Sequence, residues 1–244
     1  MGAFFPLFFF LALVGIFSAI KLLLWYQNKE QTDARELDLA VLAAEHDLRF
    51  RTAVEGFATM LRKNYFGLSF SNIEIKNVIS ERQPNNIVHL FDYSHQENGK
   101  SKELTPYSAI LIEFHNQIVP TCKISQKESI DWKGYSYIDE NLVPHWVPSK
   151  LTVIAHDDQQ KATCQFLNDN PAIRDLISQP SFHKAYFRGR RMVVYYDGMY
   201  GASETGFNWM LRRANDLRGI KGTASKAVDE DVEINLLKQS QRPG

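Results

Sequence analysis

The chain has 244 residues with 28 basic and 28 acidic side chains, and therefore no net charge. Because no overall field draws polyanions to the chain, its composition argues against a nucleic-acid partner. The two cysteines, Cys122 and Cys164, form no CxxC motif and are too few for a disulfide-rich scaffold. We expect two buried thiols in a reducing compartment, with a single disulfide as the alternative.

The first stretch, residues 3–26, is almost entirely apolar and contains one charge, Lys21. As a helix it would measure roughly 36 Å, enough to cross a hydrocarbon core of about 30 Å. We therefore predict a transmembrane anchor over residues 1–28, with Lys21, Trp25 and Tyr26 at the membrane interface. The alternative is a cleaved signal peptide, which would begin with basic residues and end with small ones.

The charges beside the apolar stretch predict its orientation. Lys21, Lys29 and Arg35 lie on its C-terminal side, and no basic residue precedes it. Because cytoplasmic flanks are enriched in Lys and Arg, we predict a bacterial inner-membrane protein whose soluble domain faces the cytoplasm.

Two short helices are predicted after a polar link at residues 27–32. Asp33 and Glu36 have the spacing of a capping box, and Thr52 and Glu55 repeat it. In the first helix the apolar residues on one face are Leu37, Val41, Ala44 and Leu48.

Alternating apolar residues and turn signals then predict closely spaced strands, which favour an antiparallel meander. The predicted strands cover residues 73–80, 87–93, 109–114 and 118–124.

Several of these segments carry a resemblance. The apolar stretch is followed by LAAEHDLRFR, NYFGLSFSN, IKNVIS and HLFDYSH. This layout resembles a family of uncharacterised bacterial single-pass membrane-anchored proteins, over residues 39–219. The resemblance implies an α+β domain behind one transmembrane helix, and it implies no catalytic residues.

The second half predicts a strand at residues 150–156, two helices and a hairpin that turns at Gly189. Asp157 is expected to cap the first helix, Pro171 to begin the second, and Ser203 to cap a last helix that ends near Gly219. From residue 221 the apolar density falls, and we expect a disordered tail over residues 221–244.

These elements together predict an α+β fold. One N-terminal transmembrane helix, residues 1–28, precedes a soluble domain of antiparallel strands and amphipathic helices at residues 29–220. A division of this domain into two halves, residues 33–125 and 149–220, is the alternative organisation.

Few residues suggest chemistry. His89, His95 and His156 lack the spacing of a metal site, and we expect ordinary partly buried histidines. Ser203 lacks the glycine that a nucleophile elbow requires two residues later, so capping is the better interpretation. We expect Asp92 to make hydrogen bonds at a strand end, because a catalytic carboxylate would need a partner that the sequence does not reveal.

Two further groups suggest surfaces. Arg188, Arg190 and Arg191 form a basic hairpin, which we interpret first as an ordinary solvated turn. The alternatives are contact with lipid headgroups, and binding of phosphate or stacking on bases together with the neighbouring aromatic residues. A second group would line a partner or ligand surface, or equally fill the core under a long loop. The aromatic residues of that group are Trp132, Tyr135, Tyr137 and Trp146.

No catalytic set, cofactor or metal ligands emerge from the sequence. We therefore predict a membrane-tethered interaction or accessory protein of a bacterial inner-membrane assembly, with the membrane and a protein as its partners. The alternative is a membrane-anchored hydrolase or small-ligand-binding enzyme whose site forms only in three dimensions.

Overall fold

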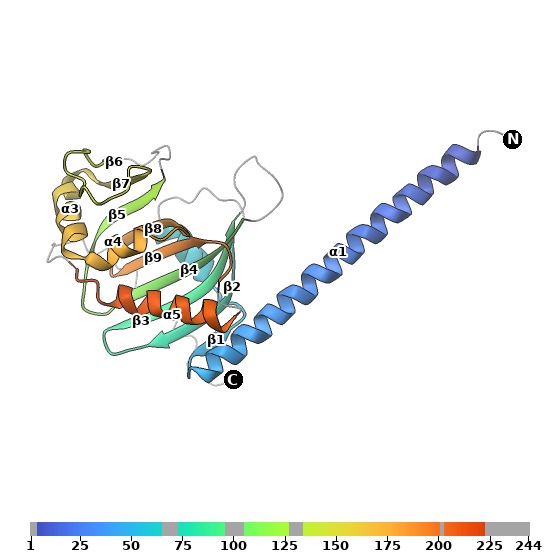
Figure 1. The fold of residues 1–244 in the computed structure, drawn as a ribbon, viewed down its shortest axis with the longest axis horizontal. Helices are drawn as coiled ribbons and strands as arrows, with labels where there is room; N and C mark the ends of the chain where they lie inside the picture. The colour runs from blue at the N-terminus through green and yellow to red at the C-terminus, as the bar shows by residue number, and fades with distance from the viewer. Residues whose placement is uncertain (1–3, 65–72, 96–104, 127–133, 201–202, 223–244) are drawn as a thin grey trace.

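The computed structural model describes residues 4–64, 73–95, 105–126, 134–200 and 203–222, without the side chains of residues 4–13, 28, 62–64, 95 and 105–106. A sheet of nine antiparallel strands forms its centre, in the order β1-β2-β3-β4-β9-β8-β5-β7-β6 (Figure 1). The strands are β1 (Arg49–Arg51), β2 (Ile73–Arg82), β3 (Asn86–His95), β4 (Thr105–Phe114), β5 (Val119–Gln126), β6 (Tyr135–Tyr137), β7 (Leu151–His156), β8 (Phe182–Gly189) and β9 (Arg191–Asp197).

The sheet interleaves the two halves of the chain. The predicted hairpin is present, and Gly189 occupies its turn at a φ of 57°, which a residue without a Cβ adopts at little cost. This hairpin is inserted between β4 and β5, because β9 pairs with β4 and β8 pairs with β5. The antiparallel pairing agrees with the sequence, but the simple meander does not.

Helices cover both faces of the sheet (Figure 1). The end of α1, with α3, α4 and α5, packs on one face, where Phe166 meets Phe187 at 5.4 Å between ring centroids. On the other face α2 inserts Phe57 against Phe91 at 5.1 Å. The helices are α1 (Phe4–Glu45), α2 (Phe57–Asn64), the 3₁₀ helix η1 (Asp157–Gln159), α3 (Gln160–Asp169), α4 (Pro171–Ile177) and α5 (Glu204–Arg218).

Helix α1 is continuous through the predicted polar link and projects far beyond the sheet (Figure 1). Residues 27–45 contain no glycine or proline, and most are good helix formers, so nothing in this segment ends the helix. Only its C-terminal part is seated on the sheet. Leu39 and Ala43 are buried there, whereas Leu37 and Val41 of the predicted apolar face are exposed. The predicted helix is present, but the predicted face is wrong.

The predicted transmembrane anchor requires a correction. Within the described part of the chain, no helix has both the length and the apolarity needed to cross a lipid bilayer. Residues 1–3 lie outside the described residues. For the residues that the structure does describe, the prediction of a transmembrane, single-pass membrane protein is therefore wrong, and the α+β fold stands without that helix.

Local signals account for most of the other differences. Two strands of three residues each, β1 and β6, escaped prediction because they are too short to show an alternating pattern. Asp157 does not cap a helix, because it begins η1 and its carboxylate accepts a hydrogen bond from Ser136 Oγ at 2.5 Å. Ser203 does cap α5 as predicted, accepting from the Gly206 amide at 3.2 Å, and Pro171 begins α4.

The far end of α5 is tied to the sheet by an ion pair between Arg218 and Glu81 on β2. Burial alone would raise the pKa of Glu81, but hydrogen bonds from Arg218 and Gln83 outweigh it and leave this pKa below its usual value.

Of the predicted tail, residues 223–244 lie outside the described residues. Lys221 exchanges backbone hydrogen bonds with the side chain of Asn170, which fastens the chain beyond α5.

Candidate functional site

A buried ion pair lies where α1 reaches the sheet. Arg35 of α1 donates to both carboxylate oxygens of Asp92 on β3, from Nε to Oδ2 at 2.9 Å and from NH2 to Oδ1 at 2.7 Å. The two side chains are 16% and 8% exposed. A bidentate pair with so little solvent exposure fixes both the position and the orientation of the guanidinium.

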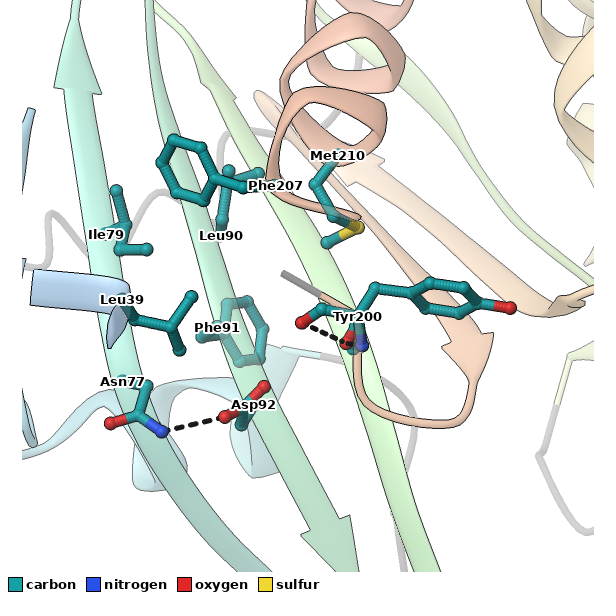
Figure 2. Close-up of a pocket in the computed structure, with 10 residues that line it drawn as sticks. Leu39, Asn77, Ile79, Leu90, Phe91, Asp92, Tyr200, Phe207 and Met210 are labelled. Carbon is teal, nitrogen blue, oxygen red and sulfur yellow. Dashed lines mark hydrogen bonds between the residues drawn. The ribbon is translucent and has the colours of Figure 1, made fainter. Parts of the chain in front are cut away.

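Two further groups complete this site. Asn77 donates from Nδ2 to Oδ2 of Asp92 at 2.8 Å (Figure 2), and the Tyr200 carbonyl accepts from Arg35 NH2 at 2.7 Å. Asn77 lies at the irregularity in the pairing of β2 with β3 and has a φ of 54°, a left-handed conformation that asparagine tolerates. We call Arg35, Asp92, Asn77 and the Tyr200 carbonyl the clamp.

The clamp borders a small pocket beneath α1 and α5 (Figure 2). The space open to the centre of a water-sized sphere is about 20 Å³, which holds roughly one water molecule. Leu39, Leu90, Phe207 and Met210 supply its apolar wall. The pocket is therefore a packing feature around the clamp and is too small for an organic substrate.

The contacts of the clamp hold elements of the fold together. Both oxygens of Asp92 already accept hydrogen bonds from Arg35 or Asn77, so this carboxylate is engaged in contacts within the protein and does not face a substrate. The hydrogen bonds predicted for Asp92 are present, but they join a strand to a helix 57 residues away. Arg35 could not be recognised as the partner from the sequence, where it is only one of the charges beside the apolar stretch.

A second polar group lies on the opposite face of the sheet. His89 Nδ1 is 2.8 Å from Ser80 Oγ, and its Nε2 is 3.7 Å from Glu113 Oε1. Arg191 also pairs with Glu113, at 3.4 Å from its Nε. Burial lowers the pKa of His89, Glu113 opposes that shift, and Arg191 and Arg51 reinforce it. His89 is consequently a neutral ring at pH 7.

This lowered pKa predicts a pH dependence of folding. Below the ordinary value of 6.5, the unfolded chain binds a proton at this position more readily than the folded chain. The free energy of unfolding should therefore fall as the pH drops below 6.5. Urea denaturation across this range should show a shallower fall for His89→Gln than for the parent. Equal slopes for His89→Gln and the parent would contradict this account.

Two other histidines pair with a carboxylate, each at a different place in the fold. His156 contacts Asp158 beside Tyr135, and His183 Nδ1 lies 3.0 Å from Asp197 Oδ1. Among the described residues, no three His, Cys, Asp or Glu side chains are placed to share a metal ion. The His95 side chain lies outside the described residues.

The predicted buried thiols are confirmed, because Cys122 and Cys164 are free and buried, and burial raises the pKa of each.

The predicted surfaces are spread over the molecule. Trp132 lies outside the described residues. Tyr135 and Trp146 are partly buried against different hydrophobic clusters, which agrees with the alternative that these aromatic residues fill the core. Arg191 is engaged with Glu113, and Arg188 and Arg190 flank the Gly189 turn. The headgroup contact proposed for these three arginines stays a prediction.

Large apolar side chains are exposed along the projecting part of α1. Those of residues 14–26 are between 46% and 67% exposed, and Lys29 Nζ lies 5.6 Å from the ring centroid of Trp25. They lie on all sides of the helix, because they occupy nearly every position of several turns. These side chains are Val14, Ile16, Phe17, Ile20, Leu22, Leu23, Leu24, Trp25 and Tyr26.

Comparison with known proteins gives one distant likeness. No protein-family profile matches the chain, and no curated protein matches it by sequence. The crystal structure of the mycobacterial trehalose monomycolate transport factor A, TtfA, aligns with 76% of this chain and 93% of its own. The TM-score is 0.47 and the sequence identity is 10%, so this likeness carries no argument about the function of the chain.

Proposed function

We propose that this protein is an accessory protein that acts by interaction, and that the apolar part of α1 links it to a lipid surface. The observation that carries the proposal is the exposed set of large apolar side chains at residues 14–26. Exposed apolar surface of this extent marks an interaction site in proteins.

Lipid is the occupant that fits this segment best. A flat protein surface would cover one side of the helix, whereas a lipid surface can bury apolar side chains along its length at the boundary between headgroups and acyl chains. Trp25 and Tyr26 carry the amphipathic rings that favour the headgroup level, and Lys21 and Lys29 carry the charge that an anionic leaflet attracts. The proposal places the protein at the cytoplasmic face of the bacterial inner membrane, where the leaflet is anionic.

The clamp connects the sheet to the lipid-binding part of α1. Arg35 lies nine residues beyond Tyr26 on the same helix, so the clamp holds the sheet in a fixed orientation relative to the apolar segment. A protein of this construction presents its sheet to other members of an assembly at a set distance from the lipid. This role requires no reaction at the clamp.

Flotation with vesicles of phosphatidylethanolamine and phosphatidylglycerol tests the proposal on the full chain. We expect the protein to float with the vesicles and Phe17→Asp/Leu23→Asp to float at least tenfold less. Burial of one large apolar side chain contributes about 1.5 to 3 kcal/mol, and a change of 1.4 kcal/mol in binding free energy corresponds to a factor of ten in affinity.

The matched control is Leu142→Asp/Met199→Asp, which changes two similarly exposed apolar residues outside α1 and should float like the parent. Failure of the parent chain to float would overturn the proposal. Self-association without lipid that Phe17→Asp/Leu23→Asp abolishes would also overturn it, because the occupant would then be a second copy of the chain.

A further inference from the structure

The strand register gathers arginines at one end of the sheet, on the face that α2 covers in part. Arg49 on β1 is opposite Ser80, which is opposite His89. One pair further along, Arg82 is opposite Ile87, Ile87 is opposite Glu113, and Glu113 is opposite Arg191. Residues that are directly opposite each other point to the same face, so these two rows lie side by side.

Three of these arginines have no carboxylate partner. Arg49, Arg51 and Arg82 form no ion pair within the described part of the chain. Arg51 belongs to the same face, because it follows Arg49 by two residues while Phe50 between them packs into the opposite core. Arg49 and Arg82 are exposed, and Arg51 is half-buried. We call Arg49, Arg51 and Arg82 the arginine face.

The nearest described carboxylate in the two rows is already engaged. Glu113 is bound by Arg191 and lies next to His89, so it does not neutralise the arginine face. Neighbouring strands are about 4.8 Å apart and alternate residues about 7 Å apart, so Arg49 and Arg82 are diagonal neighbours within reach of one small ligand. Arg51 is next to Arg49 and roughly 14 Å from Arg82. The Ser80 hydroxyl lies between Arg49 and His89 and offers a further polar contact.

We infer that the arginine face binds a soluble oxyanion of the phosphate type. Guanidinium groups match the oxygens of phosphate in pairs and form short charge-assisted hydrogen bonds with them. Arg49 and Arg82 on adjacent strands are both exposed and can bind one anion from solvent, with Arg51 beside Arg49.

A lipid headgroup is the less suitable source of this anion. The clamp lies beside Ser108 on β4, whereas Arg191 lies opposite Glu113, five residues further along that strand. Within the arginine face, Arg82 is five residues beyond Asn77 on β2, about 17 Å along the strand, whereas Arg51 is opposite Val78, next to Asn77. The arginine face belongs to the face of the sheet that α2 covers in part, whereas α1 packs on the opposite face.

The experiment titrates the full chain with inorganic phosphate at constant ionic strength and follows the imidazole signals of His89 by NMR. Bound phosphate next to His89 favours the protonated ring, so we expect the pKa of His89 to rise with phosphate and not with chloride. Arg49→Ala/Arg82→Ala should weaken binding at least tenfold. Arg174→Ala/Arg212→Ala removes two exposed arginines from the other face and should bind like the parent.

Two results would overturn the inference. One is a His89 signal that does not respond to phosphate, or that responds equally in both double variants. The other is binding of phosphatidylglycerol vesicles through Arg49 and Arg82 without binding of inorganic phosphate, which would assign these arginines to lipid. Both double variants should fold, because surface substitutions usually change stability little. Unchanged vesicle flotation of Arg49→Ala/Arg82→Ala separates this result from the role of α1.

Discussion

Replacing Asp92 with alanine should lower the free energy of unfolding by about 3 to 5 kcal/mol, the range found when one partner of a buried ion pair is removed. Arg35 would keep its charge in a site that is 16% exposed, and only the Tyr200 carbonyl would remain to accept from it. The Nδ2 group of Asn77 would lose its acceptor as well. Denaturation in guanidinium chloride measures the loss directly.

An exposed ion pair provides the control for this prediction. Glu74 and Lys76 lie 2.7 Å apart, but their side chains are 44% and 47% exposed. Pairs of this kind contribute less than about 1 kcal/mol, so Glu74→Ala should change stability little. If Asp92→Ala and Glu74→Ala had equal effects, the clamp would not be what holds α1 on the sheet.

Replacing Phe207 with alanine should have an effect of similar size, about 3 to 5 kcal/mol. Phe207 of α5 is buried against the sheet, and its ring lies 5.3 Å from that of His46, just beyond the end of α1. The substitution enlarges the pocket beside the clamp and removes contacts that seat α1. We therefore expect the exposed part of α1 near residue 30 to be cut faster by protease in this variant.

Chemical denaturation and limited proteolysis together check the Phe207 prediction. Phe207→Leu keeps most of the apolar volume and should lose less than half as much stability, while Leu142→Ala at an exposed site should lose almost none. Equal losses for Phe207→Ala and Leu142→Ala would contradict the packing described for α5.

The parts of the fold that could be predicted depend on neighbours in sequence. Gly189 in its hairpin, Ser203 at the start of α5 and Pro171 at the start of α4 all act within a few residues, and each was identified correctly. The seating of α1 depends on distant contacts instead. Two apolar stripes compete on this helix, and the sheet selects the one in which Arg35, Leu39 and Ala43 follow each other at intervals of four residues.

The clamp was beyond the reach of sequence reasoning for the same physical reason. The hydrogen-bond partners of Asp92 are Arg35 on a helix and Asn77 at an irregular point of a neighbouring strand, both distant from it in the sequence. The arginine face could not be predicted either, because β1 has three residues and is too short to show an alternation of polar and apolar side chains. Its members come together only through a register that the sequence does not reveal.

The unbroken helix α1 determines how far the sheet stands from whatever holds residues 14–26. Tyr26 and Leu39 are about 20 Å apart along the helix axis, at 1.5 Å per residue. Each residue added or removed between them would change that standoff by only about 1.5 Å but would turn the sheet by about 100° around the axis. The number of residues in this segment therefore determines which side of the domain a neighbouring protein meets.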